Sequence, residues 1–369
     1  MPLEEPEYRP PANDEFEVSI FGSGIGECLI VHLGDQQWMV VDSCLSRTLD
    51  QSIATEYLAA LGLAPENAVK WIVLTHWHDD HVKGAADLVS RCPAAKIYHS
   101  AAHHLDEYVA LTETLSPTGF TVDRNTSGIV ELAKILRVLA DRGRRDKNYV
   151  LDKFAPAIVG REITSHTASG LRVHAKALSP GDVEFNKALI ALRALIPREG
   201  QPRAVLPRPK RNHTAVAVWI EFGGHAALLG SDLEEEGSEY TGWSVILRDH
   251  RPQMKAKVFK VPHHGSVTGH KDEVWDELLV PKAVAVTTGY SRSGLPTPDD
   301  VIRVKQRTDL FGCTTRPSSC PKRDPAVERT MRETVISRQV LTGAMGHLQI
   351  RYALNGVMSL RGNRYSTLL

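Results

Sequence analysis

Three histidines and two aspartates occur within six residues, in the segment His-Trp-His-Asp-Asp-His at positions 76–81. The segment follows a short apolar run, which predicts a buried strand. In an extended chain alternate side chains point to the same side, so His76 and His78 can hold one metal ion. If a helix begins after them, Asp80 and His81 turn to a neighbouring position and can hold a second ion.

Imidazole and carboxylate groups are ligands of Zn²⁺, Mn²⁺ or Fe²⁺ at open sites that keep a water position. The segment offers no thiolate that would close the coordination shell. We therefore expect two divalent metal ions, with Zn²⁺ as the first choice and Mn²⁺ as the alternative. The competing interpretation is a solvated, histidine-rich loop, and the four potential ligands at this spacing outweigh it.

Short strands that alternate with helices along most of the chain must position these groups, which predicts a layered α/β fold. Apolar patterns predict strands at 16–22, 28–33, 38–41, 71–74, 96–99, 171–178, 213–221, 225–229, 257–261, 283–287, 313–315 and 346–351. They predict helices at 49–61, 81–90, 103–111, 127–140 and 183–195. We expect one domain over residues 1–369, with a mainly helical elaboration inserted at about 100–196.

The composition excludes several classes of protein. The 369 residues carry 44 basic and 44 acidic side chains, so a net charge of zero argues against a protein coated with positive charge for nucleic acid or membrane. No apolar run approaches the roughly 18–20 residues of a membrane span. The first 17 residues are acidic and proline-rich, unlike a secretory signal. We therefore expect a cytoplasmic protein without membrane contact.

The segment at 76–81 resembles the signature of the metallo-β-lactamase superfamily. That resemblance implies an αββα sandwich whose loops hold one or two metal ions along one sheet edge. Further motifs match: Asp42 ends an early strand and would support the metal-binding histidines, and Asp232 would bridge both ions. Asp232 follows Gly230 with Ser231 inserted between them. The last match is the pair His263 and His264 after another strand, of which we expect the first to bind metal and the second to face substrate.

The chain also resembles one subgroup, the C-terminal hydrolase domain of the bacterial DNA-uptake channel of natural competence (ComEC-like). The matching segments are 21–27, 42–43, 262–266, 287–290 and 296–298. The superfamily carries a histidine ligand before the bridging aspartate, whereas the competence-type domains have an asparagine-rich stretch there. In this chain His213 occupies that region, either as the restored ligand or as a polar residue that opens a strand.

The resemblance and the spacing together imply a set of site residues. The expected metal ligands are His76, His78, Asp80, His81, His213, Asp232 and His263. The expected catalytic residues are Asp42, Asp80 and His264. Asp42 would orient ligands, and His264 would hydrogen-bond a phosphate oxygen or protonate the leaving alkoxide.

A basic segment favours a polyanionic substrate. Residues 198–211 hold five basic side chains and one acid, and they run directly into the region of His213. The alternative is a solvated, proline-rich connection. The expected substrate-binding residues are Arg208, Lys210, Arg211, Asn212 and Ser266.

We therefore expect a phosphodiesterase, first of all a nuclease that cleaves DNA or RNA with two-metal activation of water. The second hypothesis is hydrolysis of a small phosphodiester, such as a cyclic nucleotide or a choline phosphate ester. The third is a non-catalytic partner subunit of a multi-protein system. The expected partners are nucleic acid or another phosphodiester, with a homo-oligomer or an operon-encoded protein as further expectations.

Overall fold

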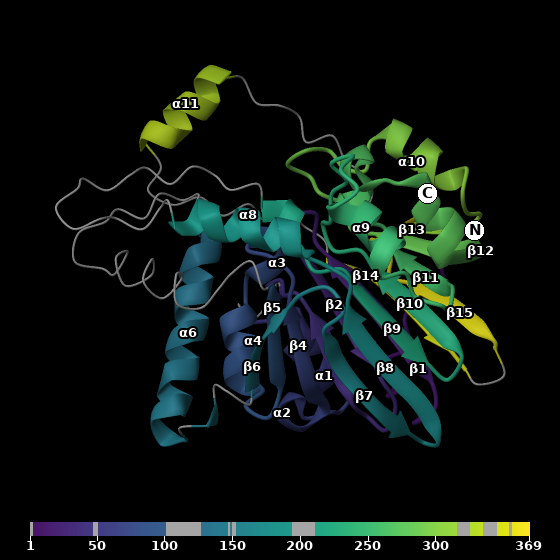
Figure 1. Ribbon diagram of the computed structural model, residues 1–369, viewed down its shortest axis with the longest axis horizontal. Helices are drawn as coiled ribbons and strands as arrows, with labels where there is room; N and C mark the ends of the chain where they lie inside the picture. The colour runs from purple at the N-terminus through teal and green to yellow at the C-terminus, as the bar shows by residue number, and fades with distance from the viewer. Residues whose placement is uncertain are drawn as a thin grey trace.

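The computed structural model describes residues 3–46, 51–100, 127–146, 148–149, 153–193, 211–315, 325–334, 345–353 and 356–369. Two mixed sheets form the centre of this part of the chain (Figure 1). The first sheet has the strand order β15 (Met358–Gly362), β14 (Gly346–Tyr352), β1 (Phe16–Gly22), β2 (Glu27–His32), β3 (Trp38–Val41), β4 (Val69–Leu74), β5 (Lys96–Ser100) and β6 (Phe154–Ala157). The second has the order β16 (Thr367–Leu368), β13 (Phe311–Cys313), β12 (Leu279–Thr287), β11 (Ala256–Lys260), β10 (His225–Leu229), β9 (Val218–Phe222), β8 (Leu171–Ala177) and β7 (Glu162–Ala168).

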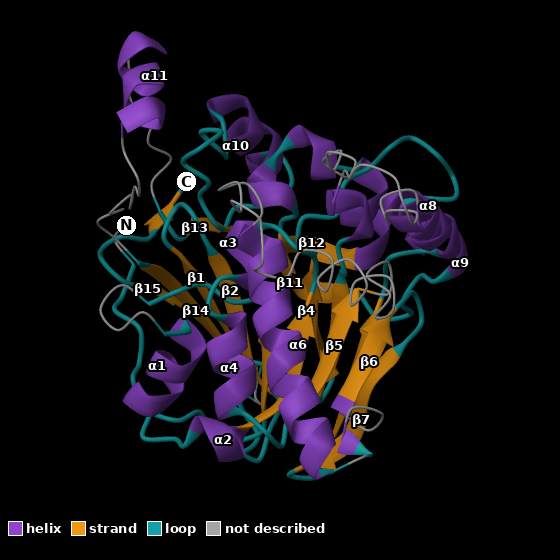
Figure 2. Ribbon diagram, turned by 90° about the vertical axis from the view of Figure 1, so that its left-hand side faces the viewer, coloured by secondary structure: helices purple, strands orange, loops and turns teal. Residues whose placement is uncertain are grey.

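Helices connect the strands of the two sheets. They are α1 (Ile53–Ala60), α2 (Pro65–Ala68), α3 (Asp79–Val82), α4 (Ala85–Arg91), α6 (Ser127–Arg145), α8 (Asp182–Arg193), α9 (Gly242–Asp249), α10 (Pro298–Lys305) and α11 (Pro325–Thr334). Figure 2 shows α1, α4 and α6 in front of the first sheet. Short 3₁₀ turns η2 (Arg211–Thr214), η3 (His263–Gly265) and η4 (Val267–Gly269) and the π-helical turn η5 (Val274–Leu278) complete the connections.

Three apolar cores define four layers. The first core lies between the inner faces of the two sheets, where Val18 and Val31 meet Val218 and Val258. The second core joins the outer face of the first sheet to α1, α4 and α6, and the third joins the outer face of the second sheet to α9, η5 and α10. Both sheets are therefore buried on two faces, which explains why their strands have nearly continuous apolar sequences. The predicted αββα sandwich is confirmed.

Several predicted elements differ from the observed ones for identifiable reasons. The helix expected at 81–90 is divided into α3 and α4 at Gly84, which has φ +82° and so breaks the helical backbone. The strand expected at 213–221 begins only at Val218, because the residues before it form η2. The helix expected at 103–111 lies outside the described residues.

The block at 100–196 contributes to both sheets. Strand β6 pairs with β5 in the first sheet, and β8 pairs with β9 in the second. Helix α6 packs on α4 and α3, with Ile135 and Leu139 in the second core. Its first turn approaches the segment at 76–81, since a Cβ built on Gly128 would lie 2.1 Å from the Trp77 carbonyl oxygen. The described part of this block is thus built into the sandwich.

Candidate metal centre

The candidate metal ligands follow strands of both sheets, and the carboxyl ends of these strands meet at one edge of the sandwich. Strands β3 and β4 are parallel neighbours in the first sheet, and β10, β11 and β12 are parallel neighbours in the second. Asp42 follows β3, the segment at 76–81 follows β4, Asp232 follows β10 and His264 follows β11. Open α/β sheets place their binding sites at such carboxyl ends.

Asp42 fixes the orientation of His81. The Asp42 carboxylate is fully buried at φ +61° and accepts hydrogen bonds from the Thr75 backbone N–H (2.8 Å) and the Thr75 hydroxyl (2.7 Å). His81 Nδ1–H donates to Asp42 Oδ2 at 2.6 Å. The proton on Nδ1 leaves the lone pair of His81 Nε2 free to bind an ion.

Two more histidines are held in the same tautomer. The Thr75 hydroxyl proton goes to Asp42, so His76 Nδ1–H donates to Thr75 Oγ1 at 3.0 Å. Likewise, Thr288 Oγ1 donates to Glu27, so His264 Nδ1–H donates to Thr288 Oγ1 at 2.9 Å. Both rings therefore present Nε2 toward the cluster.

Two adjoining sets of ligand atoms share Asp232, and a third grouping joins Asp42 to His76 and His81, although Asp42 already accepts hydrogen bonds from Thr75 and His81. One set is Asp80, His81, Asp232 and His264, and the other is His76, His78 and Asp232. Within each set the ligand atoms lie within 4.8 Å of one another. In the second set, His76 Nε2 and His78 Nδ1 are 3.1 Å apart, a separation suited to two ligands of one tetrahedral ion with bonds of about 2.0–2.1 Å.

The charge balance of the cluster favours a cation. Burial lowers the pKa of His81, but Asp232, Asp42 and Asp80 outweigh it and raise this pKa well above its usual range. The carboxylates therefore draw positive charge to His81 Nε2, where a bound metal ion would replace the proton. Burial raises the pKa of Asp80, yet His81 and His264 bring it down to about 2. His264, His81 and Lys260 similarly overcome burial and hold the pKa of Asp232 well below its usual range. Ionised carboxylates this deeply buried need positive charge nearby.

Two buried polar atoms without a hydrogen-bond partner also favour a cation at this site. Among the described residues, His81 Nε2 and Asp232 Oδ1 are buried and lack a hydrogen-bond partner, although they lie only 3.4 Å apart. A divalent ion would satisfy both atoms at once. The residues present therefore fit a divalent metal centre with imidazole and carboxylate ligands.

The pair His263 and His264 is arranged opposite to the expected assignment. His264 is 2% exposed, and its Nε2 lies 3.2 Å from Asp80 Oδ2 and 3.7 Å from Asp232 Oδ2. His263 Nδ1 instead lies 2.6 Å from Thr268 Oγ1 and 3.1 Å from Glu234 Oε1. Both residues have left-handed φ angles, +49° and +54°, so the backbone turns between them and directs the rings differently. The geometry thus favours His264 as the metal ligand.

His213 also lies apart from the metal-binding cluster. Its Nδ1 is 2.6 Å from Glu236 Oε1 and its Nε2 is 3.5 Å from Glu234 Oε2. Each ring nitrogen faces a carboxylate and His213 belongs to none of the ligand sets, which favours the interpretation of His213 as a polar residue before β9 over that of a ligand.

The expected substrate-binding residues are only partly described. Arg208 and Lys210 lie outside the described residues, and Arg211 opens η2. Asn212 is 7% exposed, and its amide Nδ2 lies 3.1 Å from His263 Nε2. The Ser266 hydroxyl accepts from the Thr268 N–H and caps η4. The structure therefore brings Asn212 next to His263 and gives Ser266 a capping contact.

A buried ion pair beside Asp232 was not predicted from the sequence. Lys260 and Glu27 are both 0% exposed, and Lys260 Nζ lies 2.7 Å from Glu27 Oε1. Lys260 Nζ also donates to the Ser231 carbonyl at 2.8 Å and lies 3.9 Å from Asp232 Oδ1. A lysine inside the apolar strand segment 256–261 was the available signal, because lysine is rarely fully buried without a partner.

Ser231 connects the ends of strands from both sheets. Its hydroxyl donates to Thr75 Oγ1 at 2.8 Å, and its carbonyl accepts from Lys260 and from the His263 N–H (3.0 Å). Ser231 adopts φ +47°, a conformation that non-glycine residues seldom take. The inserted residue thus links β4, β10 and β11 at the point where their ligands meet.

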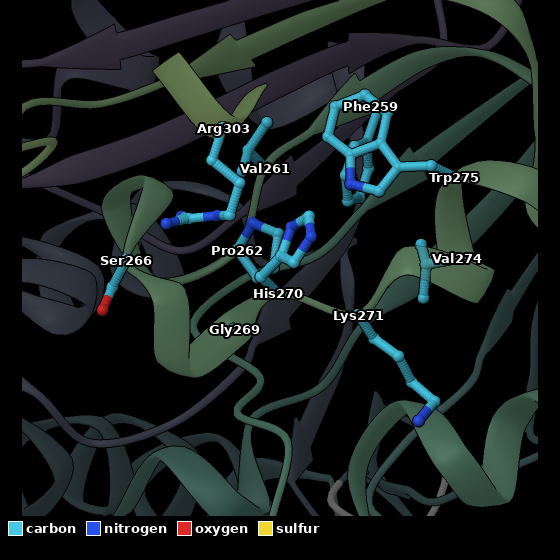
Figure 3. Close-up of a pocket in the computed structure, with 10 residues that line it drawn as sticks. All are labelled: Phe259, Val261, Pro262, Ser266, Gly269, His270, Lys271, Val274, Trp275 and Arg303. Carbon is cyan, nitrogen blue, oxygen red and sulfur yellow. The ribbon is translucent and has the colours of Figure 1, made fainter. Parts of the chain in front are cut away.

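Helix α10 supports the loop that carries His264. Arg303 of α10 donates to the Gly265 carbonyl and to Asp300 Oδ1. A small cavity lies on this side of the loop, and Figure 3 shows Arg303, Pro262, His270 and Trp275 around it. None of the ten residues that line the cavity is one of the clustered ligands.

In the described part of the chain, no helix combines the length and apolar character needed to cross a membrane.

Comparison with known proteins places these motifs in a family. The family model described as "Metallo-beta-lactamase superfamily" matches residues 22–289. ComE operon protein 3 of Bacillus subtilis (strain 168) is 32% identical over 109 residues, which are 30% of this chain and 13% of that protein. The chain therefore matches only about an eighth of the length of this relative.

Solved structures give more distant matches. The hydrolase AbOPH of the beta lactamase superfamily is 15% identical, with 63% of this chain and 74% of that chain covered and a TM-score of 0.34. Zn²⁺-bound PqqB from Methylobacterium extorquens is 14% identical, with 63% and 58% covered and a TM-score of 0.29. The dizinc quorum-quenching lactonase AidC is 16% identical, with 56% and 55% covered and a TM-score of 0.30.

Proposed function

Because the chain belongs to the metallo-β-lactamase superfamily, we propose that it is a metal-dependent phosphodiesterase whose substrate is nucleic acid, DNA or RNA. The observation that carries this proposal is the pair of ligand sets that share Asp232. Two adjoining cation positions bridged by one carboxylate suit a reaction in which negative charge develops on phosphoryl oxygens.

We assign His76, His78 and Asp232 to the first ion, and Asp80, His81, Asp232 and His264 to the second. Zn²⁺ is the first choice and Mn²⁺ the alternative, because imidazole and carboxylate ligands suit both. When bound, two such ions lower the pKa of a shared water toward neutrality and polarise the oxygens of a phosphodiester.

The surrounding residues keep the ligands in place. Asp42, Thr75 and Thr288 hold the three tautomers that present Nε2 to the ions. Lys260 offsets part of the negative charge of Asp232 and Glu27, so the acidic cluster keeps its geometry in a buried environment. His264 serves here as a ligand, which leaves it no free nitrogen to protonate a leaving alkoxide, so that role is not assigned to it.

The preference for nucleic acid over a small phosphodiester rests on the sequence. The basic segment 198–211 adjoins η2, and Asn212 of η2 contacts His263 next to the proposed ligand His264. A basic segment that directly precedes η2 in the sequence suits an extended polyanion, whose binding weakens as the salt concentration rises.

The test is hydrolysis by the metal-loaded protein of single-stranded DNA, RNA, a cyclic nucleotide and bis(p-nitrophenyl) phosphate. Asp80→Ala and His264→Ala should abolish cleavage of nucleic acid. Asp79→Ala is the matched control, because Asp79 lies in the same turn but outside both ligand sets. Cleavage of the cyclic nucleotide alone would favour the small-substrate hypothesis, and inactivity of the metal-loaded wild type on every substrate would overturn the proposal.

A further inference from the structure

A tight hairpin after β12 lies beside the proposed metal ligand His264. Tyr290 N–H donates to the Leu295 carbonyl at 2.8 Å, and Leu295 N–H donates back to Tyr290 at 3.0 Å. The Ser291 N–H donates to the Gly24 carbonyl at 2.7 Å, which ties the hairpin to the loop between β1 and β2. These backbone contacts fix the position of the Tyr290 side chain.

Tyr290 lies directly against the cluster. Its ring stacks on the His264 imidazole with a centroid distance of 4.8 Å and an interplanar angle of 11°. The side chain is partly exposed, so one part contacts the ligand and the rest faces solvent. A tyrosine hydroxyl can donate a hydrogen bond.

Arg292 adds a positive charge at the same place. It lies two residues beyond Tyr290 in the same hairpin, acts electrostatically on the Tyr290 phenol and is exposed to solvent. It makes no ion pair with any residue of the described part of the chain, whereas Lys260 is buried and already paired with Glu27. A guanidinium that has solvent access and no carboxylate partner among the described residues is available to an anionic ligand.

We propose that Tyr290 and Arg292 form an anion-binding pair at the rim of the metal centre, which donates hydrogen bonds to an unesterified oxygen of the substrate phosphate. The proposal rests on the proposed phosphodiesterase function and names residues that would bind its substrate. A guanidinium and a phenol hydroxyl together offer charge-assisted donors to a phosphate oxygen. Stacking on His264 holds the pair next to the position where the phosphate would meet the metal-binding ligands.

The experiment measures inorganic phosphate binding to the metal-loaded protein by calorimetry at low ionic strength, together with kcat and KM for bis(p-nitrophenyl) phosphate. Arg292→Gln should raise both the Kd for phosphate and KM by about tenfold, as expected for loss of a charged hydrogen bond. Tyr290→Phe should raise them by a smaller factor, and Arg292→Lys should recover part of the loss. Metal content should not change in any of the three.

Arg364→Gln is the matched control, because Arg364 also contacts a neighbouring tyrosine, Tyr365, and has no contact with the cluster. It should leave both constants unchanged. Phosphate binding equal to wild type in Arg292→Gln and Tyr290→Phe, or no phosphate binding by the wild type, would overturn the pair. Normal phosphate binding that the variants weaken, without hydrolysis of any phosphodiester, would uphold the pair and refute the proposed function.

Discussion

Asp42 shows how one residue outside the proposed ligand sets can control the metal centre. Its carboxylate contacts His81 and Thr75, and Thr75 in turn contacts His76, so a single buried side chain orients histidines of both sets. Partners of this kind hold the tautomer and the direction of the ligating ring.

Asp42→Asn should therefore weaken metal binding by about 10–100-fold while the protein stays folded. An amide cannot accept from both Thr75 and His81 as the carboxylate does, because one of its two polar atoms is a donor. Metal affinity by competition with a chelating dye measures the effect, with Asp79→Asn as the control. Wild-type affinity in Asp42→Asn would show that Asp42 does not position the ligands.

The ion pair of Lys260 and Glu27 predicts a stability effect. Lys260→Met leaves a fully buried carboxylate without its cation, which should lower the free energy of unfolding by about 3–5 kcal/mol. The double variant Lys260→Met, Glu27→Gln should recover most of this loss, because neither charge is then buried alone. Urea unfolding of the single and double variants measures the difference, and equal stability of the two would contradict the account.

Local spacing indicated the proposed ligands that are neighbours in the chain, and the family resemblance added Asp42, Asp232 and the pair His263 and His264. Neither indicated the buried pair of Lys260 and Glu27. His76, His78, Asp80 and His81 are neighbours in the chain, so the spacing alone indicated a site. Glu27 lies 233 positions from Lys260, and nothing local to either residue indicates the pair. The roles of His263 and His264 depend on two left-handed backbone conformations that no residue pattern indicates.

At the scale of elements, α6 packs against the segment at 76–81, which carries the proposed metal ligands. Leu132 of α6 packs against Trp77 and Val82, and Glu131 accepts a hydrogen bond from the Ala86 N–H. Gly128 lets the helix backbone approach the Trp77 carbonyl at a distance that excludes any side chain. The helix from the block at 100–196 thereby supports the loop that holds His76 and His78.

Gly128→Ala should push α6 away from this loop and cost about 1–3 kcal/mol of stability, as overpacking does in a close-packed interior. Because the displaced neighbour is the backbone of the metal-binding segment, metal affinity should fall as well. Val130→Ala on the exposed face of α6 should change neither quantity. Thermal unfolding and metal titration of both variants measure the two effects. If Gly128→Ala behaves like Val130→Ala, α6 does not support the loop that holds His76 and His78.

Periodicity predicted elements well where one residue pattern dominates. The strand at 38–41 and the start of α6 at 127 coincide with the prediction. The periodicity of apolar residues did not predict β6 at Phe154–Ala157, a four-residue strand that contains Pro156. An isolated sequence of that length has no strand signature, and only pairing with β5 defines it.

At the scale of the whole molecule, the first sheet carries a buried histidine that makes stability depend on pH. His347 stacks on Phe21 at 4.1 Å, and its Nε2 lies 3.0 Å from Ser19 Oγ. Burial, followed by the charge of Arg351, lowers its pKa to about 3. The unfolded chain, with a histidine pKa of about 6.5, binds this proton more readily than the folded chain does.

The stabilising contribution of the neutral, buried His347 is complete above pH 6.5 and is lost as the pH falls from 6.5 toward 3. At pH 5 the loss should reach about 2 kcal/mol for His347 alone. His347→Phe should remove this pH-dependent loss. The difference in unfolding free energy between pH 7 and pH 5 should therefore be smaller in the variant than in the wild type. His250→Gln is the control, and an unchanged difference in His347→Phe would contradict the buried neutral state of His347.

The central claim is that two ions sharing Asp232 produce a phosphodiesterase. Its most direct test follows the rate of bis(p-nitrophenyl) phosphate hydrolysis while Zn²⁺ or Mn²⁺ is added in known equivalents to the metal-free protein. We predict that the rate rises until two ions are bound per chain and that Asp232→Ala remains inactive at every ratio. A rate that does not depend on added metal, or full activity in Asp232→Ala, would contradict the claim.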